Sequence, residues 1–127
     1  IDKLRSTIER MHENDILVSL FVEPDIEQID AALGIDADLI EIHTGNYANA
    51  ATEDEMFVEL DRIKLAVEHA KRLGLGVNAG HGLNYNNITD FLEVEGIDEV
   101  SIGQSVIARS IFVGLEKAVS EMRNLIK

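Results

Sequence analysis

The chain has 127 residues, of which 46% are hydrophobic and 28% are charged, a composition typical of one globular domain. Acidic residues outnumber basic ones by 24 to 11, and the resulting net charge of −13 disfavours binding to nucleic acid or to anionic membranes. The absence of cysteine excludes disulfides, thiol nucleophiles and cysteine-based zinc sites, and no apolar run approaches the roughly 20 residues of a membrane-spanning helix.

Helical and strand-like patterns alternate along the chain. Leu4, Ile8 and Met11 repeat at helical spacing before the first short apolar run. A second helical pattern, Ile26–Leu33, is followed by Gly34 at the position of a C-cap. Four apolar runs are predicted to be strands: Ile16–Val22, Leu39–His43, Leu75–Ala79 and Glu99–Ile102.

The second half of the chain carries a long helix and three shorter ones. Thr52 and Glu55 form a capping-box pattern that is predicted to begin an amphipathic helix, and Gly74 is predicted to end it. The remaining helices are expected over Asn86–Leu92, Gln104–Arg109 and Phe112–Ile126.

Strands that alternate with helices predict an α/β fold with parallel strands and right-handed crossovers. Two architectures fit this order, an open doubly wound sheet and part of a (β/α)8 TIM barrel. Each predicted strand has one apolar face, whereas the opposite face carries Ser19, Glu41, Asn78 or Ser101. Buried strands of an open sheet are apolar on both faces, so this pattern favours the barrel. The polar face forms either an internal hydrogen-bond network or the approach to an active site, and we favour the latter.

The segments that follow the strands contain the candidate site residues. His81 lies between two glycines after the third strand, where its imidazole suits proton transfer; the alternative is a loop histidine bonded to backbone. Gly103 and Gln104 begin a helix whose N–H groups could bind phosphate, unless they form only a tight turn and cap. Glu41 could act as a base or stabilise positive charge, or it could pair with Asn78 or the serines.

The other histidines are interpreted as structural. His43 would hold the strand end that carries Glu41, whereas His12 and His69 would lie on the surface of helices. Glu41 and His43 alternate on one strand, but no third ligand converges on them, so no metal site is predicted.

Two motifs, EIHTG at residues 41–45 and NAGHGL at residues 78–83, make the chain resemble the pyridoxine 5′-phosphate synthases over nearly its whole length. That family folds as a (β/α)8 barrel, and residues 1–127 resemble its C-terminal half, strands five to eight of a single domain. The resemblance implies a transferase-type ring-closing condensation of 1-deoxy-D-xylulose 5-phosphate with 3-amino-2-oxopropyl phosphate. The products are pyridoxine 5′-phosphate, inorganic phosphate and water, and no metal or organic cofactor is implied. The absence of cysteine and of a signal-peptide pattern predicts a cytoplasmic setting.

The resemblance also implies roles for individual residues. His81 matches the proton donor of the family, and Glu41 matches a carboxylate that stabilises the transition state. Gly82 and Gly103 match positions that bind the phosphate of the aminoketone. Gln104 matches the neighbouring binding position, where the family has histidine.

The family's other catalytic histidine and glutamate, and its phosphate-binding arginines, belong to the first four strands, which this chain does not match. We therefore expect a fragment that is inactive alone and needs the N-terminal half of the barrel, and its first residue, Ile1, agrees with this. The resemblance further implies a homo-oligomer, an octamer. Two alternatives stay open. One is another sugar-phosphate barrel enzyme, which a lysine on a strand would favour, although none of the four predicted strands contains one. The other is a non-catalytic phosphate-binding or assembly module.

Overall fold

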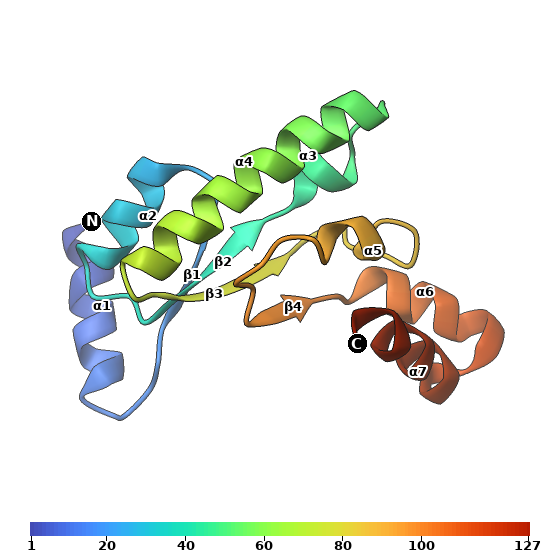
Figure 1. Cartoon of the computed structure of the whole chain (residues 1–127). Helices are drawn as coiled ribbons and strands as arrows, with labels where there is room; N and C mark the ends of the chain where they lie inside the picture. Colours follow the sequence, from blue (N-terminus) through green and yellow to red (C-terminus); the bar gives the residue numbers. More distant parts are fainter.

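A computed structural model describes all 127 residues and shows an α/β fold with one sheet of four parallel strands (Figure 1). The strands lie in chain order, so that each strand pairs with the next one along the sequence. The strands are β1 (Ser19–Val22), β2 (Leu39–His43), β3 (Gly76–Gly80) and β4 (Glu99–Ser101). The helices are α1 (Asp2–His12), α2 (Ile26–Leu33), α3 (Gly45–Ala48), α4 (Glu53–Arg72), α5 (Ile88–Phe91), α6 (Gln104–Val113) and α7 (Leu115–Ile126). The predicted α/β class and the parallel strands are confirmed.

One face of the sheet forms the hydrophobic core. Ile40, Ile42, Val77 and Ala79 are fully buried in β2 and β3, and they belong to the same cluster as the buried residues of α2 and α4. Both helices lie on this side of the sheet (Figure 1). Burial of these apolar side chains provides the main stabilisation of the layer, at about 1.5–3 kcal/mol for each large side chain. The predicted apolar face is therefore confirmed.

The opposite face of the sheet carries the polar side chains and is not covered by a helix. The strand register aligns Phe21, Glu41, Asn78 and Glu99 in one row across the four strands. Side chains alternate along a strand, and the neighbours of Glu41 and Asn78 are buried in the core, so this row lies on the side of the sheet away from the core. Because β1 and β4 each have only one neighbouring strand, the sheet is open at both edges, an arrangement that is consistent with half of a barrel.

Two aspartates tie the strands together at their amino-terminal ends. Asp38, just before β2, accepts a hydrogen bond from the Val18 N–H at 2.7 Å, and Asp98, just before β4, accepts one from the Val77 N–H at 2.8 Å. The Val18 N–H and the neighbouring His12 ring lower the pKa of the Asp38 carboxyl. The Lys71 ammonium and then the Val77 N–H lower the pKa of Asp98. Each carboxylate thus replaces a ladder bond where regular pairing begins.

Most element boundaries agree with the predicted ones to within one to three residues, and three differences are of physical interest. The first strand begins at Ser19 rather than Ile16, because the Val18 N–H bonds to an aspartate and the preceding apolar side chains are exposed. The predicted break after Arg109 is wrong, since α6 continues to Val113 and ends where Gly114 has a φ of +85°. The short helix α3 was not predicted.

The predicted ends of the long helix α4 are confirmed. The Thr52 side chain accepts a hydrogen bond from the Glu55 N–H at 3.2 Å, and the Glu55 carboxylate accepts one from the Ala51 N–H at 2.9 Å. After the helix, Gly74 has a φ of +85°, which a residue with a Cβ rarely adopts. None of the helices combines the length and the apolar character that crossing a membrane would require.

Candidate active site

A cavity of about 790 Å³ opens where β3 and β4 end, between the segments that follow these strands. Four of the five predicted site residues line it: His81, Gly82, Gly103 and Gln104. In parallel α/β folds, the carboxyl ends of strands are the usual place for ligands, because loops from several strands meet there. The sequence therefore predicted a set of residues that the fold brings together.

The first turn of α6 faces this cavity with free backbone donors. Gly103 is the N-cap residue and supplies no side-chain cap, so the first N–H groups of the helix have no partner within it. A Cβ on Gly103 would have no heavy atom within 4 Å, which shows that the backbone is open to the cavity. Gln104 and Gly103 are both exposed. Such a helix start can bind an anion through its N–H groups and its dipole.

The backbone of His81 adopts a left-handed conformation, with a φ of +83°, and Gly82 follows it with a φ of +82°. For a residue with a Cβ, this conformation costs about 1–2 kcal/mol. The fully buried Thr44 supports it, because its hydroxyl lies 2.7 Å from the His81 carbonyl oxygen and 2.8 Å from that of Gly80. The Thr44 N–H also donates to the Gly80 oxygen at 2.9 Å. The loop after β2 thus holds the loop after β3.

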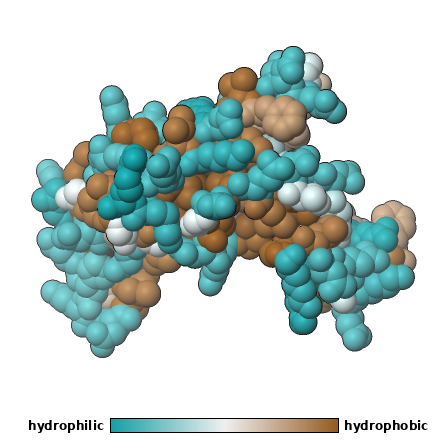
Figure 2. Space-filling model, in the orientation of Figure 1, coloured by the Kyte–Doolittle hydropathy of each residue, from teal (hydrophilic) through white to brown (hydrophobic).

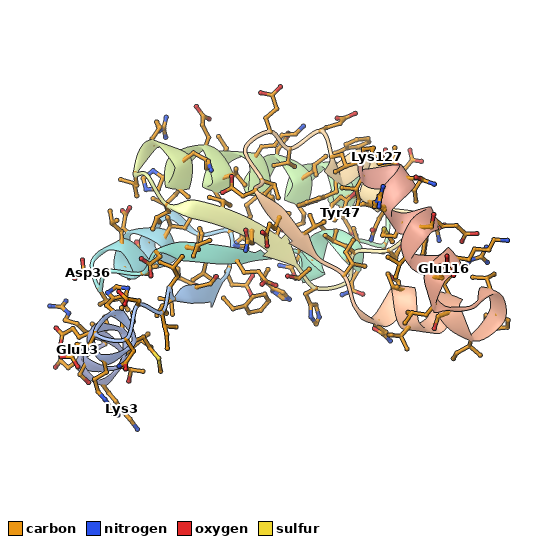
Figure 3. The ribbon with its side chains drawn as sticks, turned by 90° about the horizontal axis from the view of Figure 1, so that it is seen from below. Lys3, Glu13, Asp36, Tyr47, Glu116 and Lys127 are labelled. Carbon is orange, nitrogen blue, oxygen red and sulfur yellow. The ribbon has the colours of Figure 1, made fainter.

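Further hydrogen bonds fix the segment that follows His81. The side-chain amides of Asn84 and Asn87 donate to the Gly82 carbonyl oxygen at 3.2 and 3.1 Å. The hydroxyl of Tyr47, labelled in Figure 3, donates to the Asn87 carbonyl oxygen at 2.6 Å. Burial raises the pKa of Tyr47 to about 12, so the phenol keeps its proton and remains a donor. Two side-chain amides therefore hold the carbonyl group of Gly82, and Tyr47 in turn holds Asn87.

Glu41 does not line the cavity but lies directly beside it. The Ser101 hydroxyl, which is part of the cavity wall, donates to the Glu41 carboxylate at 3.2 Å. Gly80 ends β3, which lies between the strand of Glu41, β2, and the strand of Ser101, β4. A Cβ on Gly80 would overlap the Glu41 carboxylate. Glu41 thus pairs with a serine, one of the predicted alternatives, whereas the Asn78 side-chain oxygen has no hydrogen-bond partner. The structure contains no group of three or more acidic or histidine side chains placed to hold a metal ion.

His43 lies closer to the candidate site than its interpretation as a structural residue suggested. Its ring centroid is 4.8 Å from that of His81, and its Nδ1 is 2.7 Å from a carboxylate oxygen of Glu23. The sequence signal was available, because His43 shares a strand face with Glu41 and ends the strand. The other two histidines bond to aspartates on helical or strand-start segments instead, His12 to Asp38 and His69 to Asp30.

Comparison with known proteins gives one consistent result. The family model described as pyridoxal phosphate biosynthesis protein PdxJ matches residues 1–127. The pyridoxine 5′-phosphate synthase of Geobacter sp. (strain M21) is 48% identical over 126 residues, which cover 99% of this chain and 53% of the relative. The synthase of Sulfurihydrogenibium sp. (strain YO3AOP1) is also 48% identical over 126 residues, covering 99% of this chain and 51% of the relative. The synthase of Chlorobium phaeobacteroides is 48% identical over 124 residues, at 98% and 52% coverage. The chain spans about half the length of the curated relatives it matches.

Proposed function

The chain belongs to the PdxJ family, and we propose that it supplies the C-terminal half of a pyridoxine 5′-phosphate synthase. The observation that carries this proposal is the cavity at the ends of β3 and β4, where His81, Gly82 and the start of α6 meet beside Glu41. These are the residues that the family resemblance assigns to the site. The reaction is the condensation of 1-deoxy-D-xylulose 5-phosphate with 3-amino-2-oxopropyl phosphate to give pyridoxine 5′-phosphate, inorganic phosphate and water.

The architecture in this proposal is a (β/α)8 barrel of which the chain forms strands five to eight. Three features support it: the strands are parallel and lie in chain order, α2 and α4 cover one face, and the other face carries Glu41 and Asn78. The relatives are about twice as long, which leaves room for four further strands. In this arrangement the complementary half pairs with the edges of β1 and β4 and faces the row that contains Glu41 and Asn78.

The chemistry follows from the side chains at the rim. His81 donates and accepts protons during imine formation and elimination, since an imidazole changes its protonation near neutral pH. The Glu41 carboxylate stabilises the positive charge that develops on an iminium nitrogen, because a fixed anion in a partly shielded site interacts strongly with it. Its hydrogen bond to Ser101 holds one carboxylate oxygen toward the cavity wall.

The phosphate of the aminoketone binds at the start of α6 in this proposal. The free N–H groups after Gly103 and the backbone of Gly82 line the same cavity and can donate to phosphate oxygens. Gln104 stands where the family has histidine, and a neutral amide can still donate one hydrogen bond. Because the chain has a net charge of −13, most of the cationic contacts to the second phosphate must come from the complementary half.

A homo-oligomer is part of the same proposal. Large apolar side chains of α6 and α7 are exposed, among them Ile111 at 78% and Phe112 at 84%. Hydrophobic residues reach the surface where these two helices meet, on the right of Figure 2. Contact between subunits would remove such side chains from water. Sedimentation of the complete synthase tests this, and a monomer with these side chains exposed contradicts it.

The activity is tested in a joined protein, in which this chain replaces the matching segment of the Geobacter sp. (strain M21) relative. We expect it to form pyridoxine 5′-phosphate, and one phosphate ion per product, whereas the chain alone forms none. Replacing the proton donor, His81→Ala, is expected to lower kcat by at least about 100-fold. The proposal is contradicted if the joined protein unfolds cooperatively but makes no product, or if His81→Ala keeps its turnover. Binding of the substrates no tighter than inorganic phosphate would indicate a non-catalytic module.

A further inference from the structure

A carboxylate–histidine pair that the proposed reaction does not use lies next to the proposed proton donor. His43 ends β2 on the uncovered face of the sheet, and Glu23 directly follows the neighbouring strand β1. The His43 Nδ1 lies 2.7 Å from the Glu23 Oε1, and the side chain of His43 is 23% exposed. The ring of Phe21 contacts the imidazole edge-on, with 5.2 Å between the centroids. The imidazole is thus held by a hydrogen bond and by packing.

The hydrogen bond fixes which ring nitrogen carries the proton. An ionised carboxylate can only accept, so Nδ1 of His43 must donate to Glu23. In the neutral imidazole, Nε2 is then left with a free lone pair. Carboxylates orient metal-bound and catalytic histidines in the same way, by fixing both the tautomer and the rotation of the ring.

The Nε2 of His43 and the ring of His81 both lie against Gly45. A Cβ on Gly45 would stand 2.5 Å from the His43 Nε2 and 3.1 Å from the Cδ2 of His81. The two imidazoles therefore meet over a residue that has no side chain. Their centroids are 4.8 Å apart and their planes are tilted by 59°, so that the two rings are in contact.

We propose that Glu23 and His43 are positioning residues that hold the imidazole of His81 in the orientation needed for proton transfer. This inference rests on the proposed function, because His81 is its proton donor. His43 does not line the cavity and acts through its contact with His81. Glu23 acts one step further away, by fixing the tautomer and the ring plane of His43. The consequence is a contribution to turnover rather than to substrate binding.

The test uses variants of the joined protein that remove or keep the acceptor. Glu23→Met keeps the side-chain length and removes the acceptor, whereas Glu23→Gln keeps an acceptor oxygen. The matched control is Asp30→Leu, which removes the acceptor of His69, a histidine with a 2.6 Å bond to Asp30 and a similar exposure of 21%. That pair joins α2 and α4 on the covered side of the sheet.

We expect Glu23→Met to lower kcat by about 10-fold or more with unchanged KM for both substrates, because loss of an orienting carboxylate typically costs 10–100-fold. Glu23→Gln should recover most of kcat, and Asp30→Leu should leave it unchanged. Nitrogen-15 NMR of labelled histidine should show His43 protonated at Nδ1 in the parent and a mixture of tautomers in Glu23→Met.

The outcomes separate this inference from the proposed function. Full turnover in Glu23→Met overturns the positioning role while the synthase activity stands. An equal loss of kcat in Asp30→Leu also overturns the positioning role, because the Glu23–His43 pair would then affect kcat only through the stability of the fold. A joined protein without any activity contradicts the proposed function instead. In that case the NMR spectrum still tests the geometry, and a His43 that is unprotonated at Nδ1 overturns the inference.

Discussion

Replacement of Thr44 by valine tests how the left-handed backbone of His81 is maintained. The two side chains have nearly the same shape, so Thr44→Val removes the hydroxyl without leaving a large cavity. The Gly80 carbonyl oxygen keeps its bond from the backbone N–H of residue 44, at 2.9 Å. The His81 carbonyl oxygen loses the 2.7 Å bond from the buried hydroxyl. The control variant Thr44→Ser keeps the hydroxyl and loses only a methyl group.

The expected cost of Thr44→Val is about 1–2 kcal/mol in the free energy of unfolding, since one buried acceptor loses its partner. This is similar to the strain of about 1–2 kcal/mol in a left-handed residue that carries a Cβ, so the His81 backbone can relax once the bond is lost. Urea unfolding of the joined protein measures the cost. With a slope of about 2 kcal/mol/M, the midpoint should fall by about 0.5–1 M. We also expect a lower kcat.

If Thr44→Val unfolds at the same urea concentration as the parent and keeps its kcat, the buried hydroxyl does not support the loop of His81. The variant Thr44→Ser tests whether the effect comes from loss of the methyl group instead. If Thr44→Ser also lowers the free energy of unfolding by a similar amount, the effect comes from packing of the methyl group rather than from the hydrogen bonds.

Three further predictions concern single positions. His81→Gly should be about 1 kcal/mol more stable to urea than His81→Ala although both are inactive, because glycine adopts a positive φ without strain; equal stabilities would contradict this. Gly45→Ala should lower kcat, because its Cβ would displace the imidazole of His43, and unchanged kcat would show that the loop accommodates it. The pKa of Asp98 is lowered by Lys71, so its carboxylate stabilises the fold above the ordinary value of 3.8 and this stabilisation is lost as pH falls through the lowered pKa. Asp98→Asn should therefore be less stable than the parent at pH 7, with a difference that disappears in acid; a constant difference would contradict the assignment.

The sheet could be predicted because its signal is local. Ile40 and Ile42 alternate with Glu41, and a period of two residues assigns them to opposite faces of a strand. The candidate site was predictable for the same reason, since His81 and Gly103 directly follow strands whose ends meet at one edge of a parallel sheet.

The remaining features depend on contacts between distant parts of the chain. Glu23 and His43 are 20 residues apart, and they meet only because Val22 aligns with Ile42 in the register of β1 and β2. The sequence contains no local signal for that register. The end of α6 was missed because the helix continues past Arg109 to Gly114, whose positive φ stops it. Helical propensity alone does not distinguish these two endpoints.

In the proposed function this chain contributes half of an active site, with His81 as its proton donor. The most direct measurement is the rate of pyridoxine 5′-phosphate formation after this chain is mixed with a separately expressed N-terminal half of the Geobacter sp. (strain M21) relative. We predict that neither half turns over alone, that the mixture does, and that the His81→Ala chain forms the same complex without turnover. A stable complex of the two halves that forms no product, or one that is equally active with His81→Ala, would contradict the claim.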